Sequence, residues 1–185
     1  MTTTMKTNGI DVNALVATVN AIKQDPDIAR FQFRAQNRWQ SGGHSITTVQ
    51  GFYGAKQEDT SRTTAFKIEG DEPAVLLGTN KAPNAVELVL SALASCLAVG
   101  YVYNAAAQGI NIESLEFDIT GDLDLQGFLG LSESVRPGFI GIELRYRVKA
   151  DAPREKLEEL CDYVQRTSPM LDILRNPVPV NITLE

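Results

Sequence analysis

Two cysteines and a single histidine are the side chains best suited to nucleophilic chemistry in this 185-residue sequence. Cys96 lies near the middle of the longest apolar run, and Cys161 lies in a later amphipathic segment. A cysteine in a buried helix is usually an inert apolar side chain, and it becomes a nucleophile only where a nearby cation stabilises its thiolate. Arg38 and His44 are isolated candidates for that cation. Spacing along the sequence places neither of them beside Cys96.

Each candidate also has a simpler structural interpretation. Arg38 fits a solvent-facing strand residue, His44 a turn residue and Cys161 a packing residue on a helix. Glu87 lies nine residues before Cys96. At about 100° per residue this places the two on roughly opposite sides of a regular helix. A capping carboxylate is therefore a stronger interpretation of Glu87 than a direct catalytic role.

Several functional classes are excluded by composition and motifs. A formal net charge of -6 argues against a nucleic-acid partner, which requires a basic face. The sequence has no GxSxG turn, GxGxxG fingerprint or P-loop, and two cysteines with one histidine cannot form a Cys/His zinc site. We therefore expect no metal and no cofactor. Without a secretory signal, we expect a cytoplasmic protein with free thiols.

A long helix that carries Cys96 is predicted between Asn84 and Gly109. Asn84 is a suitable N-cap with Glu87 three residues later, and Gly109 provides the usual left-handed stop. The helix is apolar on all sides, which predicts burial in a protein core or a membrane. Serines, alanines, Gly100 and an asparagine dilute its hydrophobicity, and no Lys/Arg cluster flanks it. We therefore expect a core helix and no membrane span.

Hydrophobic periodicity predicts the other elements. Helices are expected over 11–23, 153–164 and 168–174, and strands over 29–36, 45–52, 63–68, 112–125, 139–148 and 178–184. Segment 74–77 is a loop or an edge strand, and 126–131 is a loop or a single helical turn. This order predicts an α+β fold in which antiparallel sheets pack on the long buried helix. We divide the chain into an N-terminal helical extension, 1–28, and a single domain, 29–185.

The run VELVLSALASCLAVGYVYNAAAQGINIESLEFDITGDLDL resembles the OsmC/Ohr family (osmotically inducible and organic hydroperoxide resistance proteins). Members share an ELLLAAL-x-x-C helix that ends in a glycine and is followed by a strand. GTNKAPNAVE is similar to the family's entry to that helix, SPMLDILRNPVPVNITL to its C-terminal helix-turn-strand, and NRWQSGGHSITT to an N-terminal strand-turn-strand. The similarity extends from about Phe31 to the C-terminus.

The resemblance implies an intertwined α+β homodimer with active sites at the subunit interface. It also implies thiol-dependent reduction of organic hydroperoxides or hydrogen peroxide. Cys96 matches the peroxidatic cysteine and Arg38 best matches the activating arginine. Glu87 lies nine residues before the cysteine, as in other OsmC-like branches, whereas the Ohr branch has its catalytic glutamate ten before. Ser168, before Pro169, occupies the position of the resolving cysteine.

Three functional hypotheses follow. The leading one is a peroxiredoxin-like, one-cysteine peroxidase in which an external thiol reduces oxidised Cys96, since a serine cannot form the intramolecular disulfide. Cys161, seven residues before Ser168, is a less favoured resolving thiol. The alternative is a non-catalytic dimeric protein that binds a small apolar ligand at the subunit interface. A hydrolase that uses the same thiolate is the third.

A homodimer is expected in addition because the long helix and front strands are too apolar for one subunit to cover.

Overall fold

The computed structural model describes residues 6–185, which form two compact units. The first unit combines the start of the chain up to Val12 with Leu90–Glu185, and the second is Asn13–Val89. We describe each unit by itself. Both contain helices and antiparallel strands, so the α+β class is confirmed. The division into a 1–28 extension and a 29–185 domain stays a prediction.

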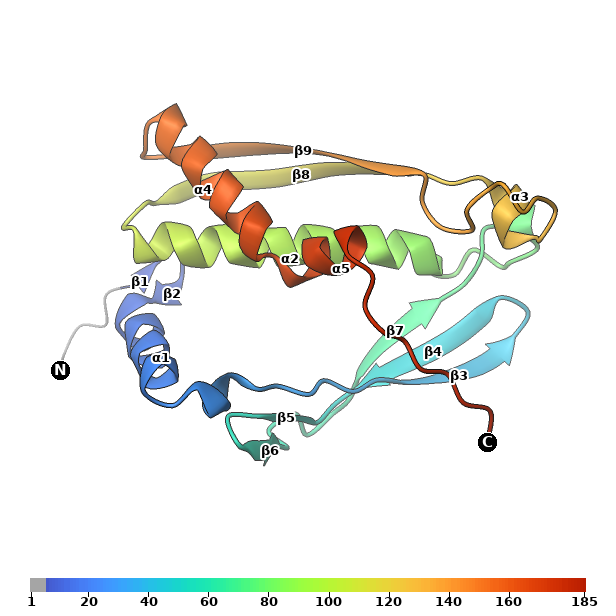
Figure 1. Cartoon of the computed structure of the whole chain (residues 1–185), viewed down its shortest axis with the longest axis horizontal. Coiled ribbons are helices and arrows are strands. Elements are labelled where there is room, and N and C mark those ends of the chain that lie inside the picture. Colours follow the sequence, from blue (N-terminus) through green and yellow to red (C-terminus); the bar gives the residue numbers. More distant parts are fainter. Residues whose placement is uncertain (1–5) are drawn as a thin grey trace. The chain divides into compact units, whose positions relative to one another are not determined.

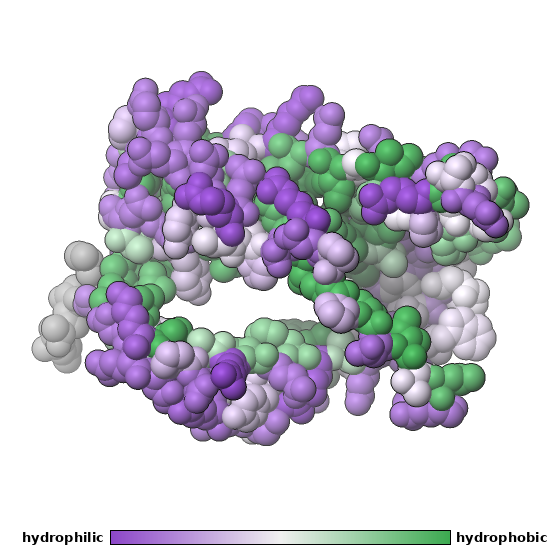
Figure 2. Space-filling view, viewed as in Figure 1, coloured by the Kyte–Doolittle hydropathy of each residue, from purple (hydrophilic) through white to green (hydrophobic). Residues whose placement is uncertain are grey.

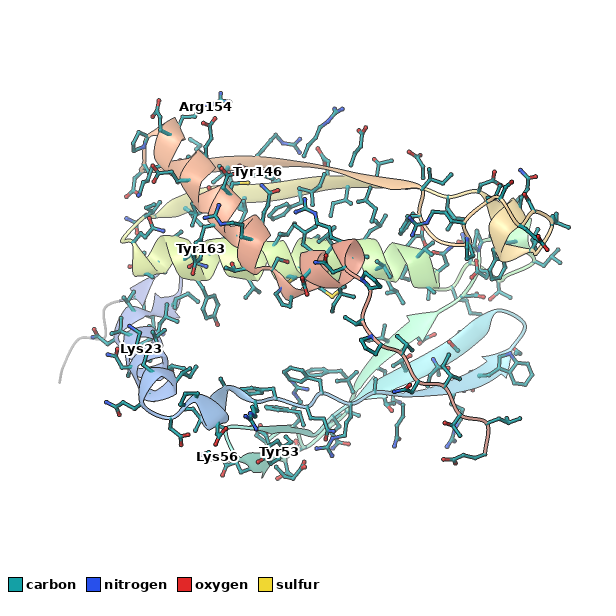
Figure 3. The ribbon with its side chains drawn as sticks, in the orientation of Figure 1. Lys23, Tyr53, Lys56, Tyr146, Arg154 and Tyr163 are labelled. Carbon is teal, nitrogen blue, oxygen red and sulfur yellow. The ribbon has the colours of Figure 1, made fainter. Side chains whose placement is uncertain are left out.

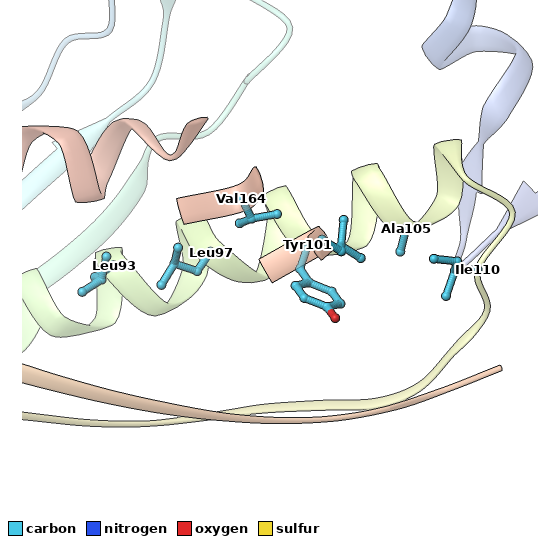
Figure 4. Packing of buried hydrophobic residues seen from close by; sticks show 7 residues of the cluster. Leu93, Leu97, Tyr101, Ala105, Ile110 and Val164 are labelled. Carbon is cyan, nitrogen blue, oxygen red and sulfur yellow. The ribbon is translucent and has the colours of Figure 1, made fainter. Parts of the chain in front are cut away.

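A two-stranded sheet and a long helix form the core of the first unit. Strands β8 (Ile112–Asp122) and β9 (Gly141–Ala150) pair antiparallel, and their side chains alternate between a half-buried and an exposed face. Helix α2 (Ala85–Ala107) runs along this hairpin (Figure 1). Its residues in the hydrophobic core cluster recur every four positions, which keeps them on one face. They are Leu93, Leu97, Tyr101 and Ala105, and Figure 4 shows how they line up along the helix.

Two C-terminal helices complete this core. Helix α4 (Arg154–Thr167) buries Leu160 and Val164 in the same cluster as α2, and α5 (Pro169–Arg175) follows directly. The opposite face of the β8–β9 hairpin is charged, with Arg147 bonded to Glu116 and Asp118. The alternation seen in the sequence therefore separates a core face from a solvent face. The predicted strands over 112–125 and 139–148 and the predicted helices over 153–164 and 168–174 are confirmed, with ends that differ by a few residues.

Helix α2 is long but is not buried on all sides in this chain. Val99 and Tyr103 are 57% and 43% exposed. One hairpin and two helices cover only part of its circumference, as expected of a helix too apolar for one subunit to cover, and its complete burial stays a prediction. By length and composition alone α2 is sufficient to cross a membrane. The residues of α2 that pack into the core of this chain lie on one of its faces.

A small hairpin at the start of the chain was not predicted. Strands β1 (Lys6–Thr7) and β2 (Ile10–Asp11) are joined by Asn8 and Gly9, both of which have positive φ. The Asn8 amide donates to the Ile110 carbonyl at 2.9 Å and accepts from the Ile112 N–H at 2.8 Å. The Asn-Gly pair is a strong hairpin signal that could have identified this turn. The hairpin is thereby joined to the segment between α2 and β8.

The second unit contains helix α1 and two small sheets. Helix α1 (Val12–Gln24) lies within one residue of its predicted range and buries none of its residues. A 3-10 turn, η1 (Pro26–Ala29), follows, and Asp25 before it bonds to Lys56 (Figure 3). One sheet has the order β3-β4-β7 and the other pairs β5 with β6. Their bounds are β3 Gln36–Ser41, β4 His44–Val49, β5 Phe52–Gly54, β6 Gln57–Asp59 and β7 Phe66–Gly70.

The first strand of this unit begins later than predicted. Phe31 and Phe33 lie outside β3, and only Gln32 makes a bridge, to Tyr53. Instead, the rings of Phe31, Phe33 and Phe52 pack together with centroid distances of 5.5 to 6.1 Å. Arg62 lies over Phe52 and Phe66. The alternating phenylalanines thus reflect an aromatic cluster, largely exposed in this chain, and not a strand.

A buried carboxylate organises the loop that leads into α2. Asp71 is 2% exposed and accepts hydrogen bonds from the Thr79 hydroxyl and from the N–H groups of Glu72, Thr79 and Lys81. These donors, the Thr79 hydroxyl foremost, lower the pKa of Asp71 to about 2. Inside the loop, residues 74–76 form a 3-10 turn, η2 (Ala74–Leu76), so the edge-strand alternative is wrong.

The end of the chain is not a strand. Residues 177–185 pair with no strand in the part of the chain that the structure describes, so the prediction for 178–184 is wrong. Val180, Ile182 and Leu184 are 73%, 91% and 98% exposed. Figure 2 shows hydrophobic surface along this segment after α5. The alternating pattern is that of a strand, but no strand among residues 6–176 pairs with it.

Candidate functional site

Cys96 lies against Ser168 in the first unit. Cys96 is half-buried on α2, and Ser168 lies between α4 and α5 with 5% of its surface exposed. The Cys96 sulfur and the Ser168 hydroxyl oxygen are 3.3 Å apart, within hydrogen-bond distance. Cys96 is a free thiol. Two positions 72 residues apart in the sequence are therefore joined at one point of the fold.

The local sequence explains why Ser168 is held there. Pro169 cannot continue α4 because it lacks an N–H, but it is favourable at the first position of a new helix. Ser168 acts as the N-cap of α5 and accepts a hydrogen bond from the Leu171 N–H at 3.2 Å. The hydroxyl is thus fixed by the helix that it caps and is not free to rotate into solvent.

A glycine allows α4 to approach α2 near this point. A Cβ atom added to Gly100 would lie 3.0 Å from a methyl carbon of Val164. Gly100 is one helical turn after Cys96, and Val164 is one turn before Ser168. The close packing of these two positions supports the contact between the thiol and the hydroxyl.

Cys161 has a different environment. It is half-buried on α4 and accepts a hydrogen bond from the Gln165 amide at 3.4 Å. Burial is the main cause that raises the pKa of two nearby tyrosines, and interaction with Cys161 adds to it. The pKa of Tyr101 is raised to about 12, and that of Tyr146, labelled in Figure 3, is raised above its usual range. Both cysteines are free thiols. The surroundings of Cys161 fit the predicted packing role.

Glu87 caps α2. The Asn84 N–H donates to the Glu87 carboxylate at 2.8 Å, and the Glu87 N–H donates to the Asn84 side-chain oxygen at 3.0 Å. This reciprocal pair is a capping box. The structural interpretation of Glu87 is therefore confirmed, whereas a catalytic role stays a prediction.

Arg38 lies in a groove of the second unit. The groove has a volume of about 660 Å³. Gln36, Arg38 and Gln40 line it together because alternate residues of a strand point to the same face. The other lining residues are Asn37, Ile46 and Thr48. Among the described residues, no carboxylate forms an ion pair with Arg38. Its guanidinium is available for an anion.

His44 is the first residue of β4, and its ring nitrogen lies 2.9 Å from a Glu69 carboxylate oxygen on β7. Like Arg38, it belongs to the second unit, whereas Cys96 and Ser168 belong to the first. An approach of either cation to Cys96 stays a prediction. Over residues 6–185 the side chains form no cluster of three or more Cys, His, Asp or Glu that could hold a metal ion.

Comparison with known proteins identifies the family. The family model for OsmC-like proteins matches residues 78–183, a range that includes Cys96 and Ser168 and begins after Arg38. The chain belongs to the OsmC-like family. Its Ser168 occupies the position that the resemblance gives to the resolving cysteine, and the 3.3 Å contact places that position beside Cys96.

Solved OsmC-like structures share the fold of this chain. An OsmC-like protein from Mycoplasma pneumoniae is 18% identical, with a TM-score of 0.59 over 79% of this chain and 89% of its own. An OsmC-like protein of unknown function from Vibrio cholerae is 15% identical, with a TM-score of 0.58 over 76% and 92%. An organic hydroperoxide resistance protein, OsmC, from Legionella pneumophila is 18% identical, with a TM-score of 0.54 over 78% and 90%. No curated protein matches the sequence.

Proposed function

We propose that this OsmC-like protein is a one-cysteine, thiol-dependent peroxidase that reduces organic hydroperoxides through Cys96. The observation that carries the proposal is a free, half-buried thiol in direct contact with the hydroxyl of Ser168. The OsmC-like family supports the reaction class, and a structural relative from Legionella pneumophila is an organic hydroperoxide resistance protein. The serine supports the one-cysteine cycle, because a hydroxyl cannot resolve an oxidised sulfur by forming a disulfide.

The chemistry needs a substrate and two external thiols. The Cys96 thiolate attacks the distal oxygen of the hydroperoxide, the O–O bond breaks, and the alcohol leaves with a proton while the sulfur becomes a sulfenic acid. An external thiol attacks that sulfur, and water leaves as a mixed disulfide forms. A second external thiol then releases Cys96 as a thiol and leaves with the first as a disulfide. The cycle needs no metal or organic cofactor.

Arg38 and Glu87 have secondary roles in this proposal. Arg38 supplies the cation that stabilises the thiolate, and its guanidinium has no ion-pair partner among the described residues. Glu87 acts through the capping box that fixes the start of α2. We also propose a direct role for it as the catalytic glutamate that the resemblance implies. An R38Q variant that keeps the wild-type rate of peroxide reduction would remove Arg38 from the mechanism.

Mass spectrometry of Cys96 tests the reaction. Purified protein is incubated with an alkyl hydroperoxide and a sulfenic-acid trap, and both cysteine-containing peptides are quantified. We expect trapped oxidation on Cys96 and not on Cys161, and full turnover only with an added thiol. C161S is the matched control and should react like the wild type. An unmodified Cys96 in fully reduced, folded protein would refute the peroxidase.

We also propose that the protein is a cytoplasmic homodimer. The exposed apolar face of α2, the aromatic cluster of the second unit and the unpaired segment 177–185 all support a second copy that covers them. The two free thiols support a reducing compartment. A monomer in analytical ultracentrifugation at micromolar concentration would contradict the homodimer.

A non-catalytic binding protein is the second candidate, and the replacement of the resolving cysteine by Ser168 favours it. In that case Cys96 lines a pocket for a small apolar ligand at the subunit interface and takes no part in chemistry. Native mass spectrometry of protein from cells compares wild type with C96S. Equal retention of a ligand by both, together with an inert Cys96, supports this candidate over the peroxidase. Loss of the ligand in C96S argues against it.

A further inference from the structure

Of the two hydrogen bonds at the Ser168 hydroxyl, the one from the Leu171 N–H has a fixed direction, and the direction of the one with Cys96 depends on whether the sulfur carries a proton. A serine hydroxyl has one proton to donate and two lone pairs that accept. The Leu171 N–H can only donate, so Ser168 accepts that bond and its own proton remains unused. The Cys96 sulfur, at 3.3 Å, is the other partner of this oxygen among residues 6–185. With 5% of Ser168 exposed, bulk water does not compete for the proton.

We infer that Ser168 is a positioning residue that donates a hydrogen bond to the Cys96 sulfur and stabilises it as a thiolate. A thiolate has no proton, so in the reactive state only the serine can be the donor. Hydrogen bonds to charged groups are stronger than those between neutral groups. The hydroxyl therefore favours the form of Cys96 that attacks a hydroperoxide. The catalytic meaning of this contact rests on the proposed peroxidase function, whereas the hydrogen bond itself does not.

The surroundings of Cys96 increase the importance of this bond. In the described part of the first unit, the Ser168 hydroxyl is the one side-chain group that bonds to Cys96. Because α5 fixes the hydroxyl through its cap, the donor is already oriented before any substrate arrives. The position that the resemblance assigns to a resolving thiol here supplies a hydrogen-bond donor to Cys96.

The rate of alkylation of Cys96 by iodoacetamide at neutral pH tests this inference, because the reagent reacts with the thiolate. In S168A, we expect the rate to fall roughly tenfold, the size expected for loss of one hydrogen bond to a charged group. S168T keeps a hydroxyl and should restore most of the wild-type rate. Cys161 provides an internal reference in the same sample, and its alkylation should be the same in all variants.

Two controls separate the sulfur from the helix cap. Asp124 is the N-cap of helix α3 (Leu125–Phe128) and accepts from the Gln126 N–H at 2.9 Å, so D124A removes a cap without touching Cys96. We expect D124A to alkylate like the wild type. S168G removes the hydroxyl but keeps a residue that is tolerated at the N-cap, so it replaces S168A if that variant does not fold. The pH profile of Cys96 alkylation should move toward higher pH in S168A and S168G, and not in S168T.

The outcomes distinguish this inference from the proposed function. Wild-type alkylation of Cys96 in folded S168A and S168G would overturn the inference, as would an equal loss of rate at Cys161. Alkylation needs no peroxide. A serine-dependent alkylation rate in a protein that leaves hydroperoxides unreacted therefore refutes the peroxidase and supports the hydrogen bond. Rapid peroxide reduction that is unchanged in S168A supports the peroxidase and refutes the inference.

Discussion

The β8–β9 hairpin of the first unit and the β3-β4-β7 sheet of the second are both antiparallel, but their apolar side chains have different surroundings. Helices α2 and α4 pack on the β8–β9 hairpin. Every buried hydrophobic residue of the described chain belongs to the first unit. In the second unit, Phe33, Trp39 and Phe66 are 69%, 68% and 58% exposed, and the buried charged residue is Asp71. The first unit is thus held together by a hydrophobic core, and the second by polar networks and ring contacts at its surface.

This difference indicates which surfaces the proposed second copy would cover. Exposed aromatic clusters of this kind usually mark an interaction surface. The first unit has a core of its own, whereas the second has apolar residues without cover from its own unit. The exposed apolar residues of the second unit therefore support the proposed homodimer, and this argument does not depend on the family resemblance. Trp39, the single tryptophan, is a fluorescence probe in the second unit, while circular dichroism follows the helices of both units.

Leu160→Ala should have the largest effect. Leu160 is 1% exposed in the core of the first unit, and truncation of a buried leucine costs about 2 to 5 kcal/mol because it leaves a cavity. Urea denaturation followed by circular dichroism measures the free energy of unfolding. A loss below about 1 kcal/mol would show that this core is less well packed than its burial indicates.

Gly100→Ala should have the next largest effect. The new methyl group would lie 3.0 Å from Val164, which is 3% exposed and cannot move away easily. Overpacking costs about 1 to 3 kcal/mol, and alanine recovers up to about 1 kcal/mol of helix propensity. We expect a net loss of about 1 kcal/mol, measured by the same denaturation, and slower alkylation of Cys96 as α4 is displaced. A more stable variant would contradict the close packing of α2 and α4.

Asp71→Asn tests the polar centre of the second unit. The pKa of Asp71 is about 2 in the folded protein, below its usual 3.8, so the ionised carboxylate stabilises the fold above about pH 4. This contribution is lost as the pH falls from 3.8 toward 2. In denaturation followed by Trp39 fluorescence, D71N should be less stable than the wild type at neutral pH, and the two should converge near pH 2. A constant difference across this range would show that the charge is not the cause.

Phe33→Ala should have the smallest effect on a single chain. Its ring is 69% exposed, and surface substitutions usually change the free energy of unfolding by less than about 0.5 kcal/mol. At protein concentrations where the chain is monomeric, we expect a change within that range. At concentrations where it is dimeric, F33A should shift the association measured by ultracentrifugation. A large loss of stability in the monomer would show that the aromatic cluster acts as a core.

Much of the fold could be predicted from the sequence because its signals are local. The N-cap Asn84, its partner Glu87 and the stop at Gly109, which has a φ of 72°, define α2 within a few residues. The start of the first strand of the second unit could not be predicted, because an alternating phenylalanine pattern is the same for a strand and for stacked rings. The prediction of a strand over 178–184 was wrong because a strand needs a neighbour to pair with, and hydrophobic periodicity does not reveal whether one is present.

The candidate site was predictable only in part. The resemblance pointed to Cys96 and to Ser168 as the altered position, but the hydrogen bond between them depends on how α4 crosses α2, and that crossing depends on packing at Gly100. The buried Asp71 was missed because its partners are mostly backbone groups of a loop. The contact of Arg38 or His44 with Cys96 stays a prediction.

The bonds from Asn8 to Ile110 and Ile112 have a consequence for the order of folding. They join positions 102 and 104 residues apart, and the whole second unit lies between them in the sequence. A ribosome must therefore synthesise the chain past residue 112 before the opening hairpin finds its partners. The second unit, which lacks a buried apolar core, is synthesised first. Its aromatic rings therefore remain exposed while the rest of the chain is made.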